Sequence, residues 1–327
     1  MLKLKGMKRL ICLIISLLTA ISITGCSKSN ITVYAPDGAP ALSLYKAMDT
    51  VSGVDFKIVG SETIETVVTG RDMVADVCIL PLDSASRLIG DGSNYQMLGA
   101  VTHGNFYFLS KEGEINKDNL SSLVGKTIGV LQLKKVPGLT FKAVLNSFEI
   151  PYVEISNVSL KQQDKVNLIA INKTEVCSSG ADVYLAPSPM ADIKENATSY
   201  SVVGSLHDLY SDSGFIQAVV VAKKSVITSN INKVKEIISC IKGVESLLLQ
   251  ESVEKICLTI ENNLESGLTP SFNKNNLTST SISRANIKFI SAKNCKAEVL
   301  EFLQKIKAVE PSAVKDVSDE FFYQGEL

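Results

Sequence analysis

The sequence predicts an α/β protein with two similar lobes, each built on a mostly parallel sheet, joined by two crossover strands and followed by a helical C-terminal region. Three observations support this fold class. Short apolar runs alternate with helical patterns, the same order of elements occurs twice, and two long extended runs interrupt the alternation. The 327 residues, of which 45% are hydrophobic, are enough for two lobes with sizeable cores.

The first part of lobe 1 is expected over residues 31–105, where apolar runs of strand length alternate with helical patterns. The expected strands are 31–35, 54–59 and 75–80, and the expected helices are 40–50, 61–69 and 83–89. An extended run over 97–109 then carries the chain out of this lobe as the first crossing.

Lobe 2 is expected over residues 106–215, where the alternation begins again. The expected helices are 117–123, 138–147, 160–170 and 189–195, and the expected strands are 127–131, 152–156 and 182–186. A second extended run, 214–223, is the return crossing. Because two crossings between lobes make a hinge, we expect the lobes to close around a ligand.

Residues 216–327 are expected to return to lobe 1 and to end in helices. Apolar residues such as Val234, Ile237 and Ile241 recur at helical spacing, which indicates a helix face packed on a core. The expected helices are 231–249, 251–264, 274–283 and 293–308, with one strand at 287–290.

The two halves repeat the same local sequence pattern. Ala75-Asp76-Val77 begins a strand that ends at Pro81, and Ala181-Asp182-Val183 begins one that ends at Pro187. The opening strand with its Pro-containing turn is likewise echoed by 127–131 and the turn that follows it. Two echoes in the same order predict two similar lobes whose strand ends point the same way.

The N-terminal segment carries the features of an export signal. A basic start is followed by a short apolar run and then by Ile23-Thr24-Gly25-Cys26, which resembles the bacterial lipobox. We therefore expect residues 1–25 to be a lipoprotein signal peptide, Cys26 to be lipidated, and 26–30 to be a tether. The alternative is an uncleaved membrane anchor, for which the apolar run is short.

Charge and motifs exclude several classes of function. The formal net charge of −1 does not indicate a nucleic-acid-binding protein. There is no G-x-S-x-G, P-loop, HExxH or CxxC motif, and the five cysteines after Cys26 match no zinc pattern. Catalytic residues, a cofactor and a metal ion are therefore not expected.

The candidate binding residues lie where strands end and helices begin. Ligands of open α/β sheets bind outside the carboxyl ends of the strands, where helix starts present free N–H groups. Four such starts follow strands in this sequence, and helix capping is the alternative role of each. The candidate residues there are Asp37, Gly38 and Ala39, then Leu82 and Asp83, then Pro137 and Gly138, and finally Pro187 and Ser188.

Three further candidates lie on the expected crossings. His103 and Asn105 are on the first crossing, and Gln217 is on the second. His103 is either a ligand contact or an ordinary polar contact. The other histidine, His207, is expected on an exposed turn.

The lipobox, the opening VYAPDGAPAL and the stretch Gly125–Val130 together resemble the type II solute-binding lipoproteins of ABC importers. The resemblance is to the branch of thiamine-precursor, riboflavin, nitrate and sulfonate binding proteins. It implies the type II periplasmic-binding-protein fold, with a solute held between the lobes by residues at the candidate positions above. It also implies a monomer, lipid-anchored on the outer face of the cytoplasmic membrane through a palmitate-bearing cysteine, that delivers solute to permease and ATPase subunits.

Two questions stay open at the level of sequence. The first is function, since an enzyme on the same fold, like those of menaquinone biosynthesis, and a solute-sensing lipoprotein are alternatives. The second is the solute. Free N–H groups at helix starts favour a sulfonate- or nitrate-type anion, whereas Asp37 and Asp83 favour a pyrimidine or vitamin precursor with N–H donors.

Overall fold

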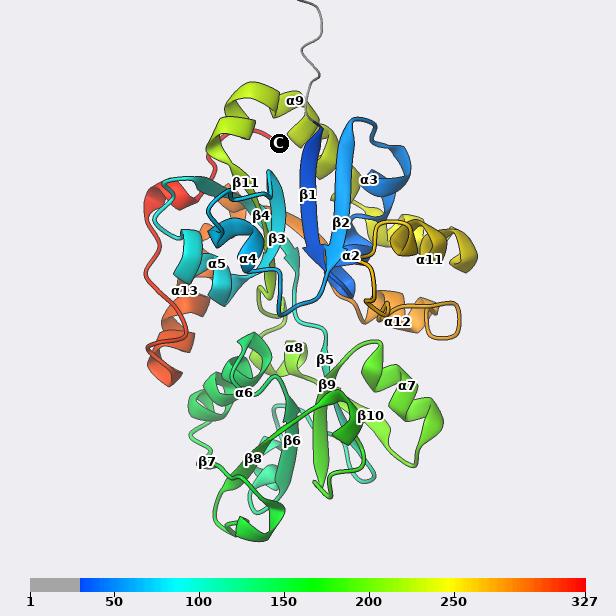
Figure 1. Ribbon diagram of the computed structural model, residues 1–327. Coiled ribbons are helices and arrows are strands. Elements are labelled where there is room, and N and C mark those ends of the chain that lie inside the picture. Colours follow the sequence, from blue (N-terminus) through cyan, green and yellow to red (C-terminus); the bar gives the residue numbers. More distant parts are fainter. Residues whose placement is uncertain (1–29) are drawn as a thin grey trace, which may run out of the picture. The chain divides into compact units, whose positions relative to one another are not determined.

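The computed structural model describes residues 30–327 (Figure 1). Residues Thr32–Leu327 form one compact unit. The expected signal peptide, most of the tether and the lipidation site at Cys26 lie outside the described residues. No helix in the described part has both the length and the apolar character needed to cross a membrane.

The first lobe contains a six-stranded sheet in the order β12-β4-β11-β3-β1-β2. Its strands are β1 (Ile31–Pro36), β2 (Val54–Val59), β3 (Val77–Pro81), β4 (Tyr95–Thr102), β11 (Ala218–Lys223) and β12 (Ile287–Ser291). β1 and β3 are parallel, whereas β11 runs antiparallel to both β3 and β4, and β12 runs antiparallel to β4. The sheet is therefore mixed, because the chain returns to it from the second lobe.

The second lobe contains another six-stranded sheet, in the order β10-β5-β9-β6-β8-β7. Its strands are β5 (Phe106–Ser110), β6 (Thr127–Leu131), β7 (Tyr152–Glu154), β8 (Val166–Ile171), β9 (Val183–Pro187) and β10 (Ser201–Ser205). Three neighbouring pairs are parallel, and β5 runs antiparallel to β9 and β10. This sheet is mostly parallel, as expected.

The echo in the sequence corresponds to the same construction in both sheets. The two echoed strands of each half are parallel neighbours, β1 with β3 and β6 with β9. Asp76 accepts a hydrogen bond from the backbone N–H of Thr32 (3.1 Å), and Asp182 accepts one from that of Thr127 (2.7 Å). Each aspartate thus joins the starts of two parallel strands, which explains why the Ala-Asp-Val pattern occurs twice.

Helices surround each sheet (Figure 1). Those of the second lobe are α6 (Val136–Ser147), α7 (Met190–Ala197) and α8 (Leu206–Tyr210), with 3-10 turns η1 (Leu120–Leu123), η2 (Val158–Leu160) and η3 (Lys173–Glu175). Those of the first lobe before the crossing are α2 (Ala39–Ser43), α3 (Tyr45–Thr50), α4 (Thr66–Thr69) and α5 (Leu82–Ile89). The C-terminal region adds α9 (Lys224–Ile241), α10 (Val244–Leu248), α11 (Val253–Glu261), α12 (Ser279–Ser283), α13 (Ala292–Val309) and the 3-10 turn η4 (Asp319–Phe321).

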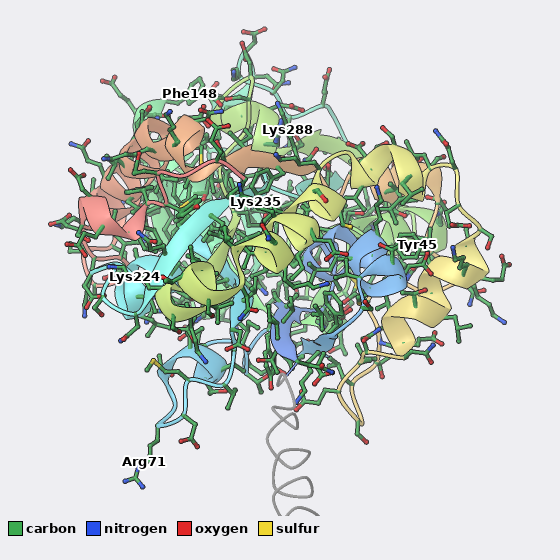
Figure 2. All side chains as sticks on the ribbon, turned by 90° about the horizontal axis from the view of Figure 1, so that it is seen from above. Tyr45, Arg71, Phe148, Lys224, Lys235 and Lys288 are labelled. Atoms are coloured by element: carbon green, nitrogen blue, oxygen red, sulfur yellow. The ribbon has the colours of Figure 1, made fainter. Side chains whose placement is uncertain are left out.

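Two C-terminal helices show how this region is held. In α9, Val234, Ile237 and Ile241 are buried as expected, and Lys235 is exposed on the other side of the helix (Figure 2). α9 contacts α3 of the same lobe. α13 contacts β4 of the first lobe and α6 of the second, so it links the two lobes independently of the crossings.

Several expected elements differ from the structure. The expected helix over 160–170 is wrong, because the segment contains β8, a strand between β6 and β7. The buried Asn167 side chain on this strand donates to the carbonyl oxygens of Gln162 and Lys165, at 2.9 Å and 3.0 Å, and so fixes the preceding loop. β10 and α8 were not expected from the sequence. The expected helix over 231–249 begins earlier, at Lys224, and is two helices, α9 and α10.

Candidate functional site

The two crossings lie side by side and are hydrogen-bonded to each other. Between β4 and β5, the backbone N–H of Asn105 donates to Gln217 Oε1 at 3.1 Å. The Gln217 carbonyl accepts from the N–H of Leu82 at 3.0 Å, where α5 begins. On the second lobe, Ser188 N–H donates to the Asn105 carbonyl at 2.9 Å, and Asn105 Nδ2 donates to the Ser188 carbonyl at 3.3 Å. Four candidate residues thus meet in one network, which we call the crossing network.

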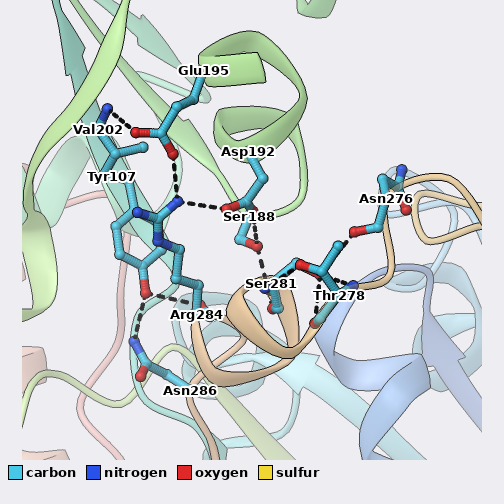
Figure 3. A network of polar contacts seen from close by, with 10 residues as sticks. All are labelled: Tyr107, Ser188, Asp192, Glu195, Val202, Asn276, Thr278, Ser281, Arg284 and Asn286. Carbon is cyan, nitrogen blue, oxygen red and sulfur yellow. Dashed lines mark hydrogen bonds and ion pairs between the residues drawn. The ribbon is translucent and has the colours of Figure 1, made fainter. Parts of the chain in front are cut away.

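The crossing network continues into an ionic contact between the lobes. Ser188 Oγ donates to Asp192 Oδ2 on α7 at 2.5 Å. Arg284, between α12 and β12 of the first lobe, lies 2.6 Å from Asp192 Oδ1 and 3.0 Å from Glu195 Oε2 (Figure 3). Tyr107 of β5 donates its hydroxyl to the Arg284 carbonyl at 3.0 Å and places its ring against the guanidinium. We call Arg284, Asp192 and Glu195 the interlobe ion triad.

A second ionic contact joins the lobes at the start of α6. Lys135 Nζ of the second lobe lies 3.4 Å from Glu65 Oε1 of the first. Arg87 Nη2 and Ser84 Oγ reach the same oxygen at 3.1 Å and 2.6 Å. Burial alone would raise the pKa of Glu65, but the Ser84 hydrogen bond and the charges of Lys135 and Arg87 hold this pKa below its ordinary value. Glu65 is therefore ionised at neutral pH.

Asp83 lies beside this contact, at the start of α5. Its side chain is buried, accepts from Ser84 Oγ at 3.4 Å, and forms no ion pair with the described residues. Burial raises the pKa of Asp83 above its ordinary value, although the Ser84 backbone N–H and the nearby Lys135 and Arg87 oppose that rise.

The first candidate turn has mainly a structural role. Asp37 Oδ2 accepts from the backbone N–H of Ser271 at 2.8 Å and from Ser271 Oγ at 2.5 Å, so Asp37 holds the loop after α11. It does not cap α2, whose N-cap is Gly38. Gly38 has a φ of 102°, in the region that favours glycine, and Ala39 is buried at the first position of the helix.

The turn before α6 is also explained by packing. Pro137 and Gly138 are buried in the first turn of this helix. A Cβ at Gly138 would collide with the backbone of Leu133, so the glycine allows the preceding loop to lie against the helix. The geometry of this turn therefore needs no ligand to account for Gly138.

The histidines lie at the hinge and contact backbone groups. His103 is buried, and its Nε2 lies 2.8 Å from the Lys288 carbonyl oxygen. His207 was expected on an exposed turn, but it lies in α8 with Nδ1 2.5 Å from the His103 carbonyl oxygen. His103 is thus a hinge contact that holds β12 against the first crossing.

The candidate Pro187 lies at the end of β9, where it pairs with Phe106 of β5.

Two buried polar atoms on the first crossing have no partner. Among the described residues, three buried side-chain atoms lack a hydrogen bond, and two of them are Thr102 Oγ1 and Asn105 Oδ1. Thr102 is 1% exposed and Asn105 is 5% exposed. Since most buried polar groups in proteins are hydrogen-bonded, two orphan oxygens three positions apart at the hinge point to a missing partner.

Sequence reasoning did not find four of these residues. Thr102, Glu65, Lys135 and Arg284 were not among the candidates. One signal was present for Arg284, because it is the only arginine after Arg87 in the sequence. The described residues contain no group of three His, Cys, Asp or Glu side chains suited to a metal ion, and their five cysteines are free.

Comparison with solved structures identifies the fold. An ABC transporter protein from Parabacteroides distasonis has a TM-score of 0.71 and 17% identity, covering 91% of this chain and 100% of its own. The periplasmic aliphatic sulphonate binding protein SsuA of Escherichia coli has a TM-score of 0.60 and 12% identity, covering 89% and 96%. A ligand-binding component of an ABC-type import system from Staphylococcus aureus, with zinc bound, has a TM-score of 0.59 and 9% identity, covering 90% and 96%. The chain therefore has the two-lobe α/β fold of these binding proteins, as the resemblance implied. The sequence matches no family model and no curated protein.

Proposed function

We propose that the protein is an extracytoplasmic solute-binding lipoprotein that captures a small molecule between its lobes and delivers it to an ABC importer. The observation that carries this proposal is the pair of orphan oxygens on the crossing between two lobes of the importer-protein fold. A solute enclosed there would supply the missing hydrogen bonds. The protein would act as a monomer with permease and ATPase subunits as partners, and it would perform no chemistry on the solute.

The remaining contacts fit a receptor that closes on its ligand. The crossing network holds the hinge, whereas the interlobe ion triad and the Lys135–Glu65 contact lie between the lobes. Contacts of this kind form when the lobes approach and are lost when they separate. The solute is a pyrimidine or vitamin precursor, or a sulfonate- or nitrate-type anion, the two classes that the sequence left open.

Solute binding is tested by thermal unfolding of the protein against a panel of small molecules. The panel contains hydroxymethylpyrimidine, thiamine, riboflavin, taurine, alkanesulfonates, nitrate and amino acids. A ligand at 100 times its Kd is expected to stabilise the protein by about 2.7 kcal/mol, which is visible as a rise in the unfolding temperature. Native mass spectrometry of the purified protein detects a ligand that is already bound and would mask a thermal shift. Absence of both a thermal shift and a bound mass would contradict the proposal.

Membrane attachment is proposed to depend on lipid at Cys26. Replacing Cys26 with alanine is expected to abolish incorporation of radiolabelled palmitate in a bacterial host, because the thiol that carries the lipid is lost. The variant is also expected to move from the membrane fraction to the soluble fraction. Cys12→Ala is the matched control and should leave both properties unchanged. A Cys26→Ala variant that still incorporates palmitate would exclude this anchor.

A further inference from the structure

The orphan oxygen of Asn105 specifies the chemistry of its missing partner. The other polar atoms of Asn105 are engaged: its N–H with Gln217, and its carbonyl and Nδ2 with Ser188. The Nδ2 contact orients the amide, so Oδ1 is the group that remains free. An amide oxygen only accepts hydrogen bonds, and its partner must therefore be an N–H or O–H donor.

The charges between the lobes disfavour an anionic partner. Each cation described above between the lobes is already held by carboxylates: Arg87 and Lys135 by Glu65, and Arg284 by Asp192 and Glu195. Asp83 adds a buried carboxyl group without an ion-pair partner among the described residues. A sulfonate would therefore meet acceptor oxygens and find no cation free to neutralise it.

On the premise of the proposed function, we infer that the solute presents at least one N–H or O–H donor to Asn105 Oδ1 and carries no net negative charge. The Thr102 hydroxyl, three residues earlier on the same crossing, provides a second group that the solute can satisfy. This decides between the two solute classes left open by the sequence. It favours the nitrogen-rich pyrimidine or vitamin precursor over the sulfonate- or nitrate-type anion.

The discriminating experiment uses probes that share a skeleton and differ in charge. Nicotinamide and nicotinate form one pair, and ethanesulfonamide and ethanesulfonate form another. Hydroxymethylpyrimidine and nitrate are added as representatives of the two solute classes. Equilibrium binding to the full chain is measured by calorimetry, and any compound released on denaturation of the purified protein is identified by mass spectrometry. The donor-bearing, non-anionic members are expected to bind at least tenfold more tightly than their anionic counterparts.

Two threonine variants test the orphan group directly. Thr102→Val removes a hydroxyl that has no partner, whereas Thr140→Val removes one that is buried and donates to the Val136 carbonyl at 2.7 Å. In solute-free protein, Thr102→Val is expected to raise the unfolding temperature and Thr140→Val to lower it. With solute present, Thr102→Val is expected to weaken binding severalfold, and Thr140→Val is not.

The outcomes separate the inference from the proposed function. Tighter binding of an anion, or release of an anionic compound from the purified protein, overturns the inference and leaves the solute-binding function standing. Thr102→Val that destabilises the solute-free protein as much as Thr140→Val also overturns it, because the hydroxyl is then satisfied without a solute. Failure to bind any probe, together with no released compound, overturns both.

Discussion

Replacing Arg284 with leucine is expected to weaken solute binding about thirtyfold. The guanidinium lies 2.6 Å from Asp192 and 3.0 Å from Glu195, and the Asp192 side chain is only 9% exposed. Removing one partner of a buried ion pair costs about 3–5 kcal/mol, and partial exposure of this triad lowers our expectation to about 2 kcal/mol. Because the ion pair joins the two lobes, we expect its removal to destabilise the closed, solute-bound state. A loss of about 2 kcal/mol in binding free energy corresponds to roughly a thirtyfold increase in Kd.

Arg71→Leu is the control for this prediction. Arg71 is exposed on the turn after α4 and extends away from the protein (Figure 2). Calorimetric titration of the two variants and the wild type with the same solute compares their affinities directly. Equal affinities for Arg284→Leu and Arg71→Leu would show that the interlobe ion triad contributes nothing to closure.

Replacing Gly138 with alanine is expected to lower the free energy of unfolding by about 3 kcal/mol or more. The added Cβ would overlap the backbone of Leu133, and a backbone segment cannot rotate away as a side chain can. Forced overpacking of a buried site typically costs about 1–3 kcal/mol and occasionally more. The measurement is chemical denaturation of the solute-free protein.

Gly53→Ala is the matched variant for Gly138→Ala. Gly53 is exposed, and a Cβ there would meet no atom within 4 Å, although its φ of 71° makes alanine strained. Its expected cost is therefore the backbone strain alone, about 1 kcal/mol. A Gly138→Ala protein that is as stable as the wild type but binds solute poorly would mean that the glycine serves ligand approach instead of packing.

Local patterns in the sequence predicted the repeated parts of the fold. The Ala-Asp-Val pattern recurs because Asp76 and Asp182 make the same bond to the neighbouring strand, and in both halves the strand ends at a proline before a helix. The strand β8 was mistaken for a helix because its apolar residues fit both periods over so short a run. Its pairing with β6 and β7, which no pattern within the segment itself can show, decides its conformation.

The residues of the crossing network were predicted in part, whereas their role in binding a solute stays a prediction. Strand ends and crossings indicated Leu82, Asn105, Ser188 and Gln217, because these positions follow from the order of elements along the chain. The pairing of Arg284 with Asp192 joins residues that no periodicity relates. Asp37 illustrates the opposite case, since its acidic side chain suggested a ligand contact but binds Ser271 in the structure.

Binding of a solute at the crossing between the lobes, against Asn105, is the premise of the proposed function. It is tested most directly by titrating the compound that most stabilises the protein into wild type and into Asn105→Leu, with thermal unfolding confirming that the variant is folded. The variant is expected to bind at least tenfold more weakly, since about 1.4 kcal/mol is lost with one hydrogen bond to a buried acceptor. Equal affinity for the two proteins would place the solute elsewhere and exclude binding against Asn105.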